Sequence, residues 1–222
     1  MTYILNIETA TKNCSVALSL NGKTIACKEI AESGYSHAEK LHVFIEEILK
    51  ESNLSFKDLS AIAVSQGPGS YTGLRIGVSA AKGLCYALNI PLIAVDTLET
   101  LTKKLHIENG LIIPMLDARR MECYTAIFNS DHQKIRAIKA EVIDENSFDD
   151  IVELIHFIGD GASKCKLILT KENFIFHDEI EFPSAGDMSQ IAFEKHQKSD
   201  TVDVAYFEPF YLKDFMVTTS SK

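Results

Sequence analysis

The 222-residue sequence lacks tryptophan, has only five prolines, and has no apolar run near the roughly 20 residues that span a bilayer. Its first residues carry neither a basic region nor a small-residue cleavage site. We therefore expect no membrane segment and no export. The five cysteines form an odd set without a C-x-x-C pair, which excludes a disulfide framework or zinc knuckle built on local spacing. We expect buried, reduced thiols at Cys14, Cys27, Cys85, Cys123 and Cys165.

Positive charge is also scarce, since 22 basic residues face 31 acidic ones and the net charge is −9. Such a chain repels a phosphate backbone unless its basic residues cluster, so an independent nucleic-acid-binding protein is disfavoured. The hydrophobic fraction of 46% is typical of a globular protein with a sizeable core. The length allows one large domain or two small ones.

Hydrophobic periodicity predicts a pattern of strands and helices that occurs twice. In the first copy, Asn21-Gly22 predicts a hairpin turn, and Ser36 with Glu39 predicts a capping box. Its expected strands are 3–8, 14–20, 23–30, 59–65 and 91–95, and its expected helices are 36–52 and 72–88. A short helix capped by Asp96 follows. The second copy has expected strands at 111–116, 122–129, 135–143, 155–159 and 166–169, and expected helices at 147–153 and 187–195.

The repeated β-β-β-α-β-α-β order predicts a duplicated α/β fold with two mixed sheets, divided into domains 1–106 and 107–222. The last segment could return to the first domain. A single continuous α/β sheet is the alternative. In a duplicated fold of this kind, ligands usually bind between the two copies.

The most informative segment is the glycine-rich stretch 65–77, between an expected strand and an expected helix. Its glycines could serve a tight turn and a close backbone approach, or expose helix amides to an anion. Leu74 stands where a Walker A loop requires lysine, so that loop is excluded. Both interpretations of the glycines remain open on the residues alone.

Four segments together resemble the TsaB (YeaZ) family, a bacterial subunit needed to make threonylcarbamoyladenosine in tRNA. They are I-E-T-A-T-K-N-C-S-V-A-L at 7–18, S-H-A-E-K-L at 36–41, G-P-G-S-Y-T-G-L-R-I-G at 67–77 and D-A-R-R-M-E-C-Y at 117–124. The resemblance is densest over residues 1–125. It implies a duplicated fold similar to the actin, Hsp70 and sugar-kinase group (ASKHA), in agreement with the repeated pattern.

The resemblance further implies a noncatalytic, cytoplasmic scaffold subunit. It would bind a catalytic relative, TsaD, which transfers threonylcarbamoyl to the tRNA adenosine next to the anticodon. The implied partners also include the ATPase TsaE and a second copy of the chain, with tRNA bound only through the complex. No cofactor is expected to be required, and weak ATP or ADP binding at a domain or subunit boundary stays open. The alternative function is an active ATP-dependent phosphotransferase or ATPase.

The residues offer little support for catalysis. None of the seven histidines is four positions from another and H-E-x-x-H is missing, so we expect no metal site. The turns after Glu8 and at Asp117 lack the glycines of open phosphate loops. The candidate interdomain or vestigial nucleotide cleft comprises Glu8, Asp117, Arg119, Arg120, Gly159 and Gly161. Two roles remain open for the charged members, ion pairs that lock the domains or contacts to phosphate.

The two long helices of the first domain offer a candidate interface. Small residues spaced three or four apart on helix 72–88 would admit a neighbouring helix, and helix 36–52 would supply apolar side chains. The expected interface residues are Leu41, Phe44, Ile45, Ile48, Gly73, Gly77, Ala80 and Ala81. Covering the domain's own sheet is the competing role for each of them.

Overall fold

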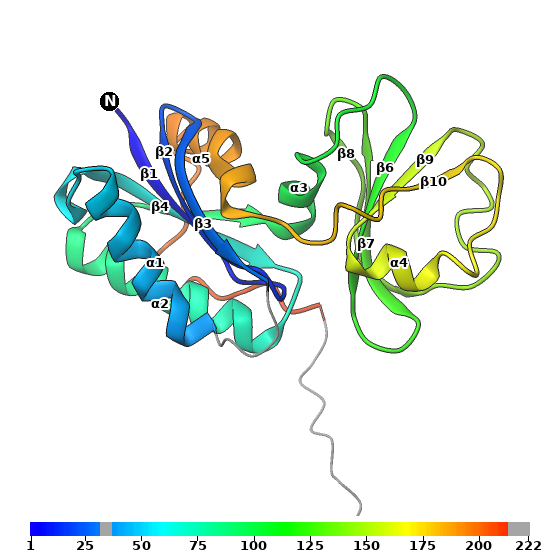
Figure 1. The fold of residues 1–222 in the computed structure, drawn as a ribbon, viewed down its shortest axis with the longest axis horizontal. Coiled ribbons are helices and arrows are strands. Elements are labelled where there is room, and N and C mark those ends of the chain that lie inside the picture. The colour runs from blue at the N-terminus through cyan, green and yellow to red at the C-terminus, as the bar shows by residue number, and fades with distance from the viewer. Residues whose placement is uncertain (32–36, 213–222) are drawn as a thin grey trace, which may run out of the picture.

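The computed structural model describes residues 1–31 and 37–212, and these residues form two five-stranded mixed sheets (Figure 1). The first sheet has the order β3-β2-β1-β4-β5. Its strands are β1 (Tyr3–Glu8), β2 (Cys14–Leu20), β3 (Lys23–Ile30), β4 (Leu59–Gly67) and β5 (Leu92–Asp96). The β1, β2 and β3 strands are antiparallel, whereas β4 pairs in parallel with β1 and with β5.

The second sheet has the order β10-β9-β6-β7-β8, which repeats the first sheet strand for strand. Its strands are β6 (Leu111–Asp117), β7 (Glu122–Asn129), β8 (Lys134–Val142), β9 (Ile155–Ile158) and β10 (Phe174–Phe176). Here too the first three strands are antiparallel and the last two run parallel to the first. The identical order confirms the predicted duplicated α/β fold.

One face of each sheet is covered by helices of the same half. Helices α1 (His37–Glu51) and α2 (Tyr71–Leu88) lie on the first sheet, where Leu41, Ile45, Val78 and Ala81 join its core. The second sheet has only the short α4 (Asp160–Cys165) in the place of α2. Phe148 and Leu169, from loops, complete that core.

The opposite faces are covered by helices exchanged between the halves. Helix α3 (Thr97–Thr102) follows the first sheet in the chain, yet Leu98 and Leu101 pack on β6 and β7 of the second. Helix α5 (Ser189–Gln197), with the 3-10 turn Ala185–Met188, follows the second sheet and packs on the first. Figure 1 shows α3 between the two sheets and α5 beside β1 and β2. Each sheet therefore needs residues from both halves of the chain.

Several local predictions are corrected by the structure. Residues 147–153 form turns, and Phe148 with φ of 66° carries the core contact that the expected helix would have made. The expected strand 166–169 is a turn after α4, and β10 takes its place in the sheet. The helix expected at 187–195 exists but covers the first sheet. Ser36 of the expected capping box lies outside the described residues.

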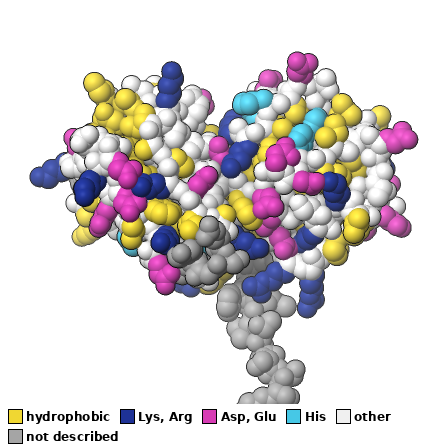
Figure 2. All heavy atoms as spheres, in the orientation of Figure 1, with side chains coloured by type: hydrophobic (Ala, Val, Ile, Leu, Met, Phe, Trp, Pro, Cys, Tyr) yellow, Lys and Arg dark blue, Asp and Glu magenta, His cyan; other side chains and the backbone are white. Residues whose placement is uncertain are grey.

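The last described residues return to the first sheet, where Val202 bridges to Leu92 of β5. The amide of Phe210 donates to the carbonyl of Gln66 over 2.7 Å. In residues 1–31 and 37–212, none of the helices combines the length and hydrophobicity needed to cross a membrane. On the face drawn in Figure 2, acidic and basic side chains are interspersed rather than gathered into one basic region.

Candidate functional site

The carboxyl ends of the central strands hold most of the residues singled out in the sequence. In the first half, Glu8 ends β1 and Ser65 lies near the end of β4. In the second half, Asp117 ends β6 and Gly159 directly follows β9. This edge is where open α/β sheets usually bind ligands, so its geometry decides between the two interpretations of the glycines.

The glycine-rich segment is packed against the chain itself. A Cβ on Gly69 would lie 2.3 Å from the carbonyl oxygen of Ala10, and one on Gly73 would lie 2.1 Å from that of Thr9. The amide of Ser70 donates to the Ala10 carbonyl over 2.6 Å, and the Ser70 hydroxyl caps α2 by accepting from the Gly73 amide. The glycines therefore let the turn after β1 lie on the start of α2. The close-approach interpretation accounts for them.

Glu8 is fully buried below this turn. Its Oε1 accepts hydrogen bonds from the Ala10 amide at 2.6 Å and the Ser65 hydroxyl at 2.9 Å. Its Oε2 is buried without a hydrogen-bond partner among the described residues. Burial raises the pKa of the Glu8 carboxyl to about 7, against the hydrogen bonds that lower it. A carboxyl that is about half protonated at neutrality and closed off from solvent is a poor ligand for a magnesium ion.

The second half repeats the arrangement with α4 in place of α2. A Cβ on Gly159 would lie 2.2 Å from the carbonyl oxygen of Met115, and one on Gly161 would lie 3.0 Å from the backbone of Leu116. Gly159 has φ of 102°, in the left-handed region that favours glycine. These two glycines thus bring the start of α4 onto the end of β6, as Gly69 and Gly73 do for α2.

Lys164 of α4 closes the turn at Asp117. Its ammonium forms an ion pair with the Asp117 carboxylate and donates to the carbonyls of Arg120 and Glu122, each over 2.8 Å. The amide of Asp117 donates to Asp160 over 3.0 Å, and burial raises the pKa of Asp160. Asp117 is therefore held inside the second half rather than paired across the two halves.

Arg119 and Arg120 occupy a tight, exposed turn, with φ of 73° and 54°. The ion pairs that join the two halves are not the ones expected around Asp117. Lys134 of β8 pairs with Asp96 at the end of β5, and Lys104 pairs with Asp187 over 3.6 Å. Asp96 was visible in the sequence as a helix cap, but nothing there indicated Lys134 as its partner.

A nucleotide's phosphates fit this edge poorly. The space at the first turn is filled by Thr9 and Ala10, and Asp117 is neutralised by Lys164. The exposed side chains of Lys12, Arg119 and Arg120 offer donors suited to an anion. Within the described part of the chain, no three metal-ligating side chains converge on one point.

The expected interface residues lie on the inner face of their helices. Leu41, Ile45, Ile48 and Ala81 are at most 2% exposed and belong to the core below α1 and α2. A Cβ on Gly77 would lie 2.3 Å from the Thr9 hydroxyl, so Gly77, like Gly73, faces the chain's own turn. Phe44 and Ala80 are half-buried against the same core. The outer face of these helices is the part exposed to solvent.

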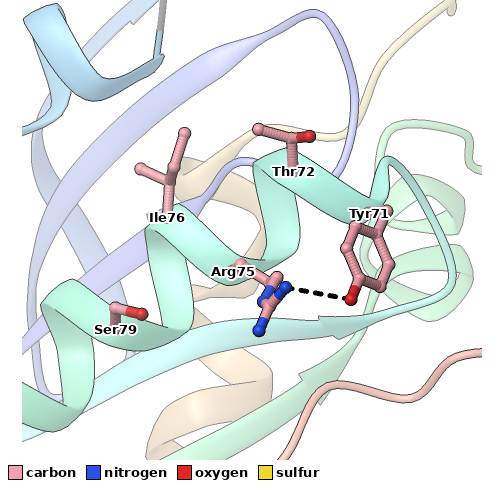
Figure 3. Close-up of a pocket in the computed structure, with 5 residues that line it drawn as sticks. All are labelled: Tyr71, Thr72, Arg75, Ile76 and Ser79. Carbon is pink, nitrogen blue, oxygen red and sulfur yellow. Dashed lines mark hydrogen bonds between the residues drawn. The ribbon is translucent and has the colours of Figure 1, made fainter.

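That outer face has a surface cavity of about 370 Å³ along α2 (Figure 3). Arg75 donates to the Tyr71 hydroxyl over 2.9 Å and lies 5.0 Å from the centre of its ring. Ile76 and Ser79 continue the lining, and further along α2, Gly83 has open space where a Cβ would be. The exposed stripe thus combines one small, one apolar and several polar positions. The expected interface residues of α2 lie on the stripe that the structure buries.

The comparisons with known proteins cover most of the chain. A family model described as TsaD, tRNA N6-adenosine threonylcarbamoyltransferase, matches residues 30–215. The chain is 32% identical over 221 residues to the tRNA threonylcarbamoyladenosine biosynthesis protein TsaB of Escherichia coli, covering 95% of this chain and 94% of that protein. The chain belongs to the TsaB (YeaZ) family. This confirms the resemblance found in the sequence motifs.

Two further comparisons concern the fold and one part of the sequence. YeaZ from Pseudomonas aeruginosa superposes with a TM-score of 0.83 at 24% identity, covering 96% of this chain and all of that one, which shows a shared fold. A tRNA N6-adenosine threonylcarbamoyltransferase of Bacillus thuringiensis is 39% identical over 109 residues, covering 42% of this chain and 32% of that enzyme. The pairwise match of this chain to that transferase therefore covers only part of each.

Proposed function

We propose that this chain is the noncatalytic subunit of a tRNA threonylcarbamoyladenosine synthesis complex and that it binds a TsaD-type transferase. The likeness to TsaB of Escherichia coli over 95% of the chain carries the proposal, because that relative's name places it in this biosynthesis. The packed glycine turns support a scaffold rather than a phosphotransferase, since their space is taken by the chain's own backbone. TsaE and tRNA would join through the complex, in bacterial cytoplasm.

The outer face of α2 and the neighbouring part of α1 form the proposed docking surface, for TsaD or for a second copy of the chain. Thr72, Ser79, Gly83 and Tyr86 of α2 are exposed, and Val43 of α1 is 44% exposed. Gly83 would let a partner helix approach closely, because small residues shorten the distance between helix axes. A weak ATP or ADP site, where one exists, would fit the boundary of the complex better than the filled turns.

The first experiment tests the activity. Purified chain supplied with threonylcarbamoyl-adenylate and tRNA should leave the tRNA unmodified and should not hydrolyse ATP. Adding the TsaD and TsaE of the same bacterium should produce modified tRNA, and omitting this chain should abolish it. Modification by the isolated chain, unchanged by added TsaD, would overturn the scaffold role in favour of the enzymatic alternative.

The second experiment tests the surface. Gly83→Arg places a long charged side chain where the structure has open space, so the fold should be unchanged while a helix packed there would be displaced. Gln197→Arg, exposed on α5 at the other face of the first sheet, is the matched control. We expect Gly83→Arg to weaken TsaD binding at least about tenfold, equal to about 1.4 kcal/mol. Native affinity in a folded Gly83→Arg protein would place the interface elsewhere.

A further inference from the structure

Two buried cysteines meet directly beneath the turn that carries Arg119 and Arg120. Cys123, the second residue of β7, and Cys165, the last residue of α4, are both 0% exposed. Their sulfur atoms lie 3.8 Å apart. The other buried thiols are placed differently, as Cys85 shows by donating to the carbonyl of Pro91 over 3.5 Å.

The surroundings of this pair make its two sulfurs unequal. The hydrogen bond between the two sulfurs lowers the pKa of the Cys165 thiol, as does the Lys164 ammonium, against the effect of burial. The same hydrogen bond and burial raise the pKa of Cys123. The Cys123 thiol also donates to the carbonyl of Gly161 over 3.7 Å, which holds its proton on Cys123. Because a thiolate is the reactive form of cysteine, Cys165 is the expected nucleophile of the pair. Burial raises the pKa of Cys85 to about 12, which leaves that thiol inert by comparison.

We propose that Cys123 and Cys165 form a redox modification site, at which a hydroperoxide converts the two thiols into an intramolecular disulfide. This role goes beyond the scaffold function and does not depend on it. The Cys165 thiolate would attack the peroxide oxygen, break the O–O bond and become a sulfenic acid as the first water leaves. The Cys123 sulfur would then attack the Cys165 sulfur and release the second water. Two thiols and one hydrogen peroxide thus give one disulfide and two waters.

The required movement is small and involves a short element. A disulfide is ~2.05 Å long, and the two sulfurs are 3.8 Å apart in the structure. Cys165 ends a six-residue helix that begins at the glycine turn 159–161, so α4 can shift without breaking a longer element. Such a local opening of α4 would also admit the peroxide.

The disulfide would tie α4 to β7 at the point where Lys164 already contacts the turn. Lys164 adjoins Cys165 and donates to the carbonyls of Arg120 and Glu122, and Glu122 adjoins Cys123. Oxidation would therefore set the position of the 117–122 turn covalently, where the reduced protein holds it by hydrogen bonds and an ion pair. The site couples the oxidant to the two exposed arginines of this edge.

The test uses the full-length chain, reduced and then treated with hydrogen peroxide. Free thiols are alkylated with one reagent under denaturing conditions, disulfides are reduced, and the released thiols are alkylated with a second reagent before peptide mapping. We expect Cys123 and Cys165 to carry the second reagent. A parallel digest left unreduced should contain a Cys123–Cys165 crosslinked peptide, lighter by two hydrogens and reversed by dithiothreitol. Cys85 should carry the first reagent. Cys27, the exposed thiol, is the internal measure of oxidant strength.

Three variants test the order of the steps. Cys123→Ser should accumulate a sulfenic acid at Cys165 that dimedone labels, whereas Cys165→Ser should leave Cys123 unlabelled. Cys85→Ser, at a buried thiol outside the pair, should leave the disulfide yield unchanged. The proposal is overturned if Cys123 and Cys165 stay reduced in the wild-type chain at a peroxide dose that oxidises Cys27 fully. It is also overturned if the disulfide forms only in protein that has lost its native circular dichroism.

Discussion

The hydroxyl of Thr9 donates a hydrogen bond to the carbonyl oxygen of Gly73 over 2.8 Å, joining the turn after β1 to the first turn of α2. The contact needs Gly73, because any Cβ there would lie 2.1 Å from the Thr9 carbonyl oxygen. Thr9 is itself fully buried. The segment that looked most like a ligand loop is thus an internal joint of the first half.

Gly73→Ala should therefore destabilise the protein. The added methyl group has to displace the Thr9 backbone, and overpacking of this kind costs about 1–3 kcal/mol. Gly83→Ala on the same helix is the control, because nothing lies within 4 Å of its Cβ position. Alanine is favoured over glycine in a helix interior by about 1 kcal/mol, so this variant should be more stable than wild type. Urea denaturation measures the free energy of unfolding of both variants. Equal effects of the two substitutions would contradict the close packing of Gly73 on Thr9.

Ala81→Glu should unfold the chain rather than dissociate a complex. Ala81 is 0% exposed in the core below α2, and an unpaired carboxylate buried there costs several kcal/mol. Gly83→Glu introduces the same charge two residues away at an open position and should keep the fold. Circular dichroism and thermal unfolding distinguish the two variants. A folded Ala81→Glu protein with a native melting temperature would contradict the inward orientation of that face.

Glu8→Gln should change how stability depends on pH. The Glu8 pKa is raised from 4.5 to about 7 in the folded chain, so the folded state holds a proton that the unfolded state releases. The stability that this carboxyl gives the wild-type protein is therefore fully present below pH 4.5 and is lost as pH rises through 7. Glutamine stays neutral and keeps an oxygen acceptor for Ala10 and Ser65.

The variant should therefore gain stability relative to wild type between about pH 4.5 and 7, and the gain should level off above that range. The plateau is on the order of 3 kcal/mol, from 1.36 kcal/mol per pKa unit. Urea denaturation across pH 5 to 8 gives the curve, with the exposed Glu46→Gln as control. A difference between Glu8→Gln and wild type that does not vary with pH would mean that Glu8 titrates normally.

Lys134→Met should cost more stability than Arg120→Ala. Lys134 is the ion-pair partner of Asp96, which is 6% exposed and also caps α3 through the amides of Leu98 and Glu99. Removing Lys134, itself partly exposed, leaves that carboxylate less compensated, so we expect a loss of about 1–2 kcal/mol, below the range for fully buried pairs. Arg120 is exposed, and surface changes usually stay within about 0.5 kcal/mol. Chemical denaturation compares the loss of stability in the two variants. A larger loss in Arg120→Ala would contradict this prediction and favour the 117–120 turn as the contact that holds the two halves together.

The fold was predictable because its strong signals are local. Asn21-Gly22 predicted the first hairpin, and the apolar spacing predicted α1 and α2. The second half was less predictable. Phe148 adopts a left-handed backbone in a turn that fills the core, and the residues around it carry a helix-like pattern.

The site was predictable only in part, because its key contacts link residues far apart in the sequence. Lys164 with Asp117, Lys134 with Asp96 and Cys123 with Cys165 leave no spacing pattern that one sequence can reveal. The residues predicted for the interface lie on the inner faces of α1 and α2. Small residues indicate a close approach, but they do not indicate whether the neighbour is a partner or the same chain. Gly73 and Gly77 meet Thr9 of the same chain.

The exchange of α3 and α5 between the two sheets has a consequence for folding. A fragment ending at residue 106 would contain the first sheet but leave Ile4, Ala63 and Val95 uncovered, because their cover comes from α5. A fragment starting at 107 would leave Ile112 and Phe128 without α3. The first half therefore cannot complete its hydrophobic interior during synthesis until the ribosome has released α5. Unfolding of the whole chain should accordingly be a single cooperative event, even though its backbone forms two separate sheets.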